Sequence, residues 1–118
     1  MNIEECYEKM GGNYADVINR LRKETLVTKF LVRFPEDPSY GELAESIDKG
    51  DTETAFRAAH TLKGVCQNLG LEKLFVSADE ATEALRGGDI DKAKLVMPTL
   101  SSDYEMIVDT INEFAEGQ

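Results

Sequence analysis

Apolar side chains recur every three or four residues along most of this chain, which is the spacing of one face of an α-helix. No segment alternates apolar and polar residues between turn signals, so strands are not expected. Glycine and proline divide the helical pattern into separate helices. The pattern predicts four longer helices, at about 38–49, 51–69, 71–86 and 89–114, and three shorter ones, at 3–10, 14–20 and 24–33.

Several of these helices carry recognisable end signals. Asp51 and Asp89 each follow a glycine and are good N-cap residues, so a helix is expected to begin at each of them. Pro35 ends the helix over 24–33, because proline cannot continue the amide hydrogen bonds. Pro98 falls inside the last helix and is expected to interrupt it with a kink or a joint.

The links between the four longer helices are short, and short links place neighbouring helices antiparallel. The sequence therefore predicts an all-α fold, an antiparallel up-down four-helix bundle with short additional N-terminal helices that cover one end. A chain of 118 residues is expected to form a single domain over 1–118. The bundle core is expected at about 20–115.

Acidic residues outnumber basic ones, with 23 Asp and Glu against 13 Lys and Arg and a net charge of −10. This excess argues against nucleic acid or an anionic membrane as a partner, because both require cations on the protein surface. It fits either simple solubility or a partner with a basic rim. The acidic N-terminus and the lack of a long apolar run favour a cytoplasmic location. The lack of a coiled-coil heptad favours a monomer.

The cysteines and the single histidine form no metal-binding pattern. Cys6 and Cys66 lie far apart in the sequence, and neither belongs to a CxxC pair. Two reduced thiols are the simplest interpretation, because disulfides are rare in cytosolic proteins. No metal site is therefore predicted.

The helix over 51–69 carries the only histidine, His60, away from its apolar face. On a helical wheel centred on Leu62, the residues that share its face are Ala55, Ala58, Ala59, Val65, Cys66 and Leu69. His60 falls on the opposite side. It is therefore expected to be exposed, either as an ordinary surface residue or as a functional one.

Four neighbours share the side of the helix that carries His60. Lys63 can bring its ammonium group near a group attached to the imidazole, and Gly64 leaves a gap beside the ring. A mid-helix glycine costs about 1 kcal/mol relative to alanine, so the gap is expected to admit something. Phe56 and Gln67 lie on the same side, and both are expected to contact a docked partner. The alternative for Phe56 is a ring packed against the adjacent helix.

This arrangement suits phosphoryl transfer. A neutral imidazole is a good nucleophile near pH 7. Phosphoryl transfer depends mainly on positioning and electrostatics, and a protein donor must approach in line with the attacking nitrogen. An unobstructed helix surface admits such a donor, whereas a deep pocket would suit a small substrate.

The segment AHTLKG at 59–64, followed by Leu69-Gly70, resembles the core motif of histidine-containing phosphotransfer (HPt) domains. The resemblance implies a phosphocarrier without turnover of its own, which accepts and donates a phosphoryl group between His60 and aspartates of receiver domains. It implies phosphorylation at Nε2 of His60, charge stabilisation by Lys63 and access for the receiver at Gly64. The implied partners are a response-regulator receiver domain, a hybrid histidine kinase, or both. No cofactor is expected on this chain, because Mg²⁺ would belong to the receiver.

Two positions depart from the family pattern. Many members have small or hydroxyl residues where this chain has Val65-Cys66, and both are expected to face inward. Members also often carry a glutamine on the following helix that hydrogen-bonds the imidazole, and its position here falls near Thr82. Threonine is shorter and orients the ring less well. Gln67 is a partial substitute from the solvent side.

Two other functions stay open. The bundle is alternatively a non-phosphorylated docking module for a receiver or a histidine kinase, which uses the same surface around Phe56 and Gly64. An enzyme with His60 as general base is disfavoured, since the motif holds no acidic residue to orient the ring. Acidic pairs elsewhere, at Glu4-Glu5 and Asp79-Glu80, are expected to be solvated.

Overall fold

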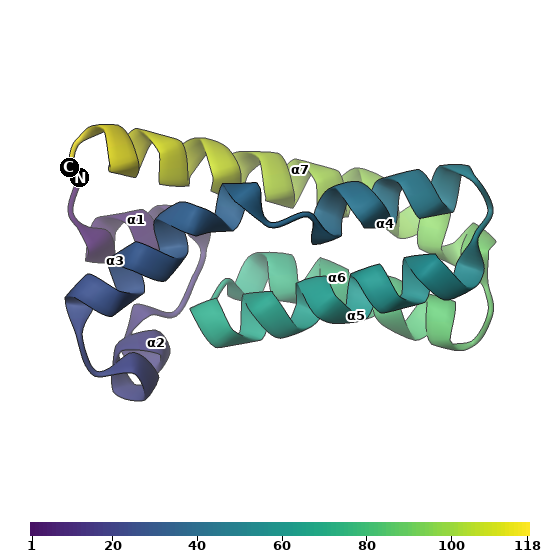
Figure 1. The fold of residues 1–118 in the computed structure, drawn as a ribbon, viewed down its shortest axis with the longest axis horizontal. Coiled ribbons are helices and arrows are strands. Elements are labelled where there is room, and N and C mark those ends of the chain that lie inside the picture. Colours follow the sequence, from purple (N-terminus) through teal and green to yellow (C-terminus); the bar gives the residue numbers. More distant parts are fainter.

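The computed structural model describes all 118 residues and contains helices only. The prediction of an all-α helical bundle is therefore confirmed. Figure 1 shows the fold. The helices are α1 (Ile3–Met10), α2 (Tyr14–Leu21), α3 (Glu24–Arg33), the 3₁₀ turn η1 (Phe34–Glu36), α4 (Ser39–Asp48), α5 (Thr52–Leu69), α6 (Glu72–Arg86) and α7 (Ile90–Glu116).

Helix α7 runs along the whole molecule, and the other helices pack against it or against each other (Figure 1). From α4 to α7 the chain reverses direction at each short link, so consecutive helices lie side by side and antiparallel. Helices α1 and α3 lie beside the C-terminal part of α7. The N-terminal helices thus cover one end of the bundle.

Side-chain caps begin the two longest helices. Asp51 accepts a hydrogen bond from the backbone amide of Thr54, and Asp89 accepts one from the amide of Lys92. Each bond satisfies an amide that the first helical turn leaves without a partner. The predicted starts at these two aspartates are confirmed.

The predicted joint at Pro98 is wrong, while a kink there stays a prediction. Helix α7 continues from Ile90 to Glu116 through this proline. Pro98 is exposed, so the missing amide hydrogen bond displaces no packed side chain. The packing of α7 against α6, α1 and α3 holds it in one piece.

The core stripe of α5 is buried as predicted, with one exception. Cys66 is fully buried, and burial raises the pKa of its thiol to about 12. Val65 was expected to face inward as well, but it is only half-buried. It lies at the edge of the stripe, where α5 meets a cavity instead of a neighbouring helix. None of the helices combines the length and apolar composition needed to cross a bilayer.

Candidate functional site

His60 lies in the middle of α5 and is exposed on the side opposite the core. Its ring centroid is 5.9 Å from that of Phe56, one turn earlier on the helix, with an angle of 44° between the ring planes. The hydrogen bonds of the side chains around it go to other partners. Both ring nitrogens are therefore free to meet an approaching group.

Space beside the imidazole is open, as the sequence predicts. Gly64 lies one turn beyond His60, and a Cβ placed on it would have no atom within 4 Å. The fold therefore does not require a glycine at this position. Its role in admitting a partner stays a prediction.

Lys63 contacts an acidic residue that the sequence analysis misjudged. Its Nζ lies 2.8 Å from Oδ1 of Asp79 on α6, and 5.9 Å from the centroid of the Phe75 ring. The prediction that Asp79 is merely solvated is wrong. The antiparallel pairing of α5 with α6 places these residues opposite each other, and the sequence shows that register only after both helix ends are fixed.

Of the two alternatives for Phe56, the structure shows packing against the adjacent helix. The ring is half-buried against the core, and Cζ of Arg86 lies 5.0 Å from its centroid. Arg86 in turn donates a hydrogen bond to Glu83 at 3.2 Å. The exposed part of the ring adjoins His60, and its contact with a partner stays a prediction.

Neither residue proposed to orient the imidazole does so. Thr82 lies opposite His60 in the α5–α6 register, between the Lys63–Asp79 and Phe56–Arg86 contacts. It is fully buried, and its hydroxyl donates to the carbonyl of Ala78 at 2.7 Å. The expectation for Thr82 is therefore corrected: this hydroxyl serves its own helix.

Gln67 is exposed, two helical turns beyond His60. Seven residues of α-helix span about 10 Å along the axis, which a glutamine side chain bridges poorly. The expectation that Gln67 substitutes as a ring orienter is not supported by this geometry. Its proposed contact with a docked partner stays a prediction.

Arg57 is a cation near His60 that the sequence analysis missed. It lies one turn before His60, is exposed, and has no acidic partner in the structure. The spacing of three residues between Arg57 and His60 was the available signal. Lys63 differs from Arg57 in that its ammonium is already paired with Asp79 on α6.

The C-terminal end of α5 is fixed by the N-terminal helices. The hydroxyl of Tyr7 donates a buried hydrogen bond to the carbonyl of Leu69 at 2.7 Å. Arg20 on α2 donates to the carbonyls of Gln67 and Asn68, at 2.9 and 2.7 Å. A cation at a helix C-terminus also complements the helix dipole. These bonds hold the helix that carries His60.

Gly70 ends α5 in the left-handed region, with φ of 65°. A Cβ placed on it would lie 2.3 Å from Cγ2 of Val17 and 2.8 Å from the carbonyl oxygen of Asn13. The close approach of α2 to the end of α5 therefore requires a glycine here.

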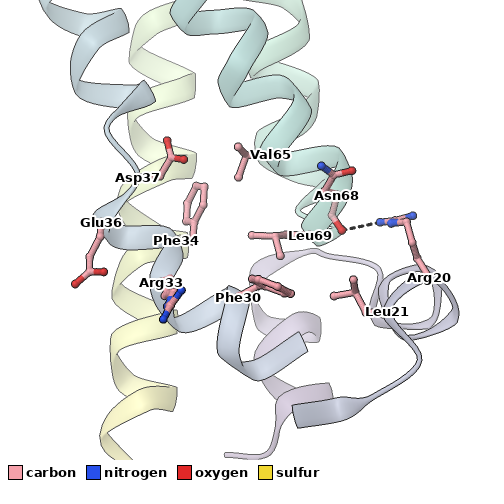
Figure 2. A pocket seen from close by; sticks show the side chains of 10 residues that line it. All are labelled: Arg20, Leu21, Phe30, Arg33, Phe34, Glu36, Asp37, Val65, Asn68 and Leu69. Carbon is pink, nitrogen blue, oxygen red and sulfur yellow. Dashed lines mark hydrogen bonds between the residues drawn. The ribbon is translucent and has the colours of Figure 1, made fainter. Parts of the chain in front are cut away.

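A cavity of about 520 Å³ adjoins this region, between α2, α3, η1 and the last turns of α5. Figure 2 shows the residues around it and the hydrogen bond from Arg20 to Asn68. Its apolar lining consists of Leu21, Phe30, Phe34, Val65 and Leu69. Val65, which follows Gly64 directly, is among its lining residues, whereas His60 and Gly64 are not. The cavity has no signal in the sequence, because its walls come from separate segments.

No group of three or more His, Cys, Asp or Glu side chains is placed to hold a metal ion. What the site offers is a nucleophilic imidazole on a convex surface, and such a site serves a protein partner better than a small substrate.

Comparison with known families agrees with that class. The model of the Hpt domain matches residues 25–110, which is most of the chain and includes all of α5 and α6. The chain therefore belongs to the Hpt domain family. Domains of this family are helical phosphocarrier modules of phosphorelays, and they interact with receiver domains and kinases. Comparisons with curated proteins and with solved structures gave no match.

Proposed function

We propose that this chain is a histidine phosphotransfer protein of a two-component phosphorelay. In this function His60 accepts a phosphoryl group from an aspartate of a receiver domain and donates it to another. One observation carries the proposal: His60 is exposed at the middle of α5 with open space at Gly64 beside it. The partners are a response-regulator receiver domain and a hybrid histidine kinase.

The transfer step requires little from this chain beyond a free imidazole nitrogen. The lone pair of Nε2 of His60 attacks the phosphorus of the aspartyl phosphate, the P–O bond breaks and a P–N bond forms. The electron pair of the broken bond returns to the aspartate as a carboxylate, and Nδ1 keeps its proton. Mg²⁺ is expected in the acidic pocket of the receiver, where it neutralises the phosphoryl oxygens.

Lys63 supplies charge on this side of the transfer. A phosphoryl group adds about −1.5 to −2 charges at pH 7. Lys63 lies one turn beyond His60, so its side chain can bring the ammonium to that charge by leaving Asp79. Arg57 is a further cation on the exposed side of the same helix.

The docking surface extends from Phe56 past Gly64 to Gln67. We infer that the receiver also reaches the apolar cavity, because its lining includes Val65, the residue that follows Gly64. Phe30, at the far side of this cavity, is 42% exposed and adds apolar area to this surface.

Transfer of label tests the proposal. Receiver domains phosphorylated with labelled phosphate are mixed with the wild-type chain and with His60→Gln. We expect acid-labile, alkali-stable label on the wild type only. Circular dichroism melts of both proteins show whether the variant is folded. Absence of label on the folded wild-type chain with several receivers would refute the function.

The alternative is a docking module that binds a receiver or kinase without carrying phosphate. It is favoured by the lack of any side chain that orients the His60 ring, since Thr82 bonds to Ala78 instead. The two functions differ in their dependence on the imidazole. Partner signalling that is unchanged in His60→Ala would favour docking alone. That the chain acts in the cytoplasm and as a monomer stays a prediction for both functions.

A further inference from the structure

The ion pair between Lys63 and Asp79 is the only one that joins α5 to α6. The other ion pairs of the chain lie within single helices or join α7 to α1 and α6. The pair is close, at 2.8 Å, and the Lys63 side chain is only 24% exposed. Partial shielding from water strengthens the attraction between such charges. Before any phosphoryl group arrives, the ammonium of Lys63 therefore already has a counter-charge.

A role in holding the bundle together does not account for this pair. Helices α5 and α6 are already joined by the buried core, to which both contribute several fully buried residues. Asp79 is 41% exposed, and ion pairs at such positions contribute little to stability. The position of the pair, one turn from His60, is the feature that needs an explanation.

We propose that Asp79 competes with the phosphoryl group on His60 for the ammonium of Lys63, and thereby sets the equilibrium of phosphoryl transfer. The inference rests on the proposed function of His60. Asp79 is in this sense a positioning residue, which acts through Lys63 and does not touch the reacting atoms. No covalent bond changes at Asp79 or Lys63.

The direction of the effect follows from the charges. In the unphosphorylated chain Asp79 neutralises Lys63. In the phosphorylated chain the phosphoryl group, with more negative charge than one carboxylate, attracts the ammonium away. The carboxylate of Asp79 is then left to solvent, which its exposure permits. Phosphorylation therefore breaks the Lys63–Asp79 ion pair. Because the pair forms again when the phosphoryl group leaves, it favours return of that group to a receiver.

Other charges near the site do not take the place of Asp79. Arg86, which stacks on Phe56, is bonded to Glu83. Glu80 is exposed and forms no ion pair, although it directly follows Asp79. Glu80 is therefore a matched control, since Glu80→Gln removes the same charge from the same helix turn.

The test compares Asp79→Asn with Glu80→Gln. Each variant is brought to equilibrium with a receiver domain that labels the wild-type chain, and the ratio of labelled carrier to labelled receiver is measured. We expect Asp79→Asn to raise this ratio about two- to fivefold, the range given by the strength of an exposed ion pair. Glu80→Gln is expected to leave it unchanged. Thermal unfolding of both variants measures any effect on the fold.

A double variant separates action through Lys63 from a simple charge effect. If Asp79 acts through Lys63, adding Asp79→Asn to Lys63→Ala leaves the equilibrium of the single Lys63 variant unchanged. The inference would be overturned if Asp79→Asn raised the ratio of labelled carrier to labelled receiver equally with and without Lys63. It would also be overturned if Asp79→Asn and Glu80→Gln changed this ratio equally. A wild-type chain that labels normally while Asp79→Asn matches it would refute this inference alone. A wild-type chain that never labels would refute the proposed function.

Discussion

Two glycines of the same segment, Gly64 and Gly70, differ in what surrounds them. At Gly64 a Cβ would meet no atom within 4 Å, and the helix continues past it. At Gly70 a Cβ would collide with Val17 and with the backbone of Asn13, and the backbone is left-handed. The fold itself explains Gly70. It does not explain Gly64, so a contact outside the chain is the better reason for that glycine.

The comparison extends to the helix as a whole. The C-terminal end of α5 is bonded to Tyr7 and Arg20 and buried under α2, whereas its middle presents His60 to solvent. One end is fixed by the protein and the middle is left for a partner. A rigid support beneath an open surface keeps the imidazole at a defined place when a receiver arrives.

The largest expected effect is on stability, from Gly70→Ala. The left-handed backbone and the collision with Val17 together predict a loss of about 3 kcal/mol in the free energy of unfolding. Gly50→Ala is the matched control, since Gly50 is also left-handed, with φ of 73°, but a Cβ there meets nothing. Urea unfolding of both variants measures the difference. Equal losses would show that the contact with α2 is unimportant.

Alkaline pH tests the buried side of the same helix. Burial raises the pKa of Cys66 from 9.0 to about 12, so the unfolded chain loses this proton first as the pH rises. The contribution of this protonated thiol to the free energy of unfolding is present in full below pH 9 and declines as the pH rises toward 12. At pH 10.5 we expect a loss of roughly 2 kcal/mol from this thiol. Urea unfolding at pH 7.5 and 10.5 checks it, and Cys66→Ala should show a flatter dependence. The same slope in both proteins would contradict the assignment.

The open side is tested by Gly64→Gln. A side chain at this position is expected to fill the gap beside His60 and to reduce the rate of phosphoryl transfer more than tenfold, while the circular dichroism spectrum stays unchanged. Gly41→Gln on α4 is the control, because Gly41 is also helical and open but lies on another helix. Normal transfer by the Gly64 variant would show that the receiver approaches from another direction.

The smallest expected effect is a gain in stability at Gly64. Gly64→Ala is expected to raise the free energy of unfolding by about 0.5–1 kcal/mol, because alanine is the better helix former and the space is free. Thermal unfolding measures the gain. A loss of stability would mean that the fold, and not a partner, requires this glycine.

The sequence predicts the helices better than it predicts the contacts between them. Capping residues and glycines are local signals, so the sequence alone predicts that helices begin at Asp51 and Asp89. Pro98 does not divide α7 into two helices, because packing along the helix outweighs one missing hydrogen bond. A helical wheel gives the direction of a side chain but not what lies there. It therefore placed His60 correctly, while the partner of Lys63 and the incomplete burial of Val65 depend on neighbouring helices.

The N-terminal helices give the chain a folding unit larger than its family segment. The Hpt domain match begins at residue 25, yet Tyr7, Val17 and Arg20 all precede it. These residues bond to or pack against the end of α5. A fragment cut at the family boundary would keep His60 and lose the support of its helix. Fusion proteins and grafted carriers made from this chain should therefore retain α1 and α2 as part of the module.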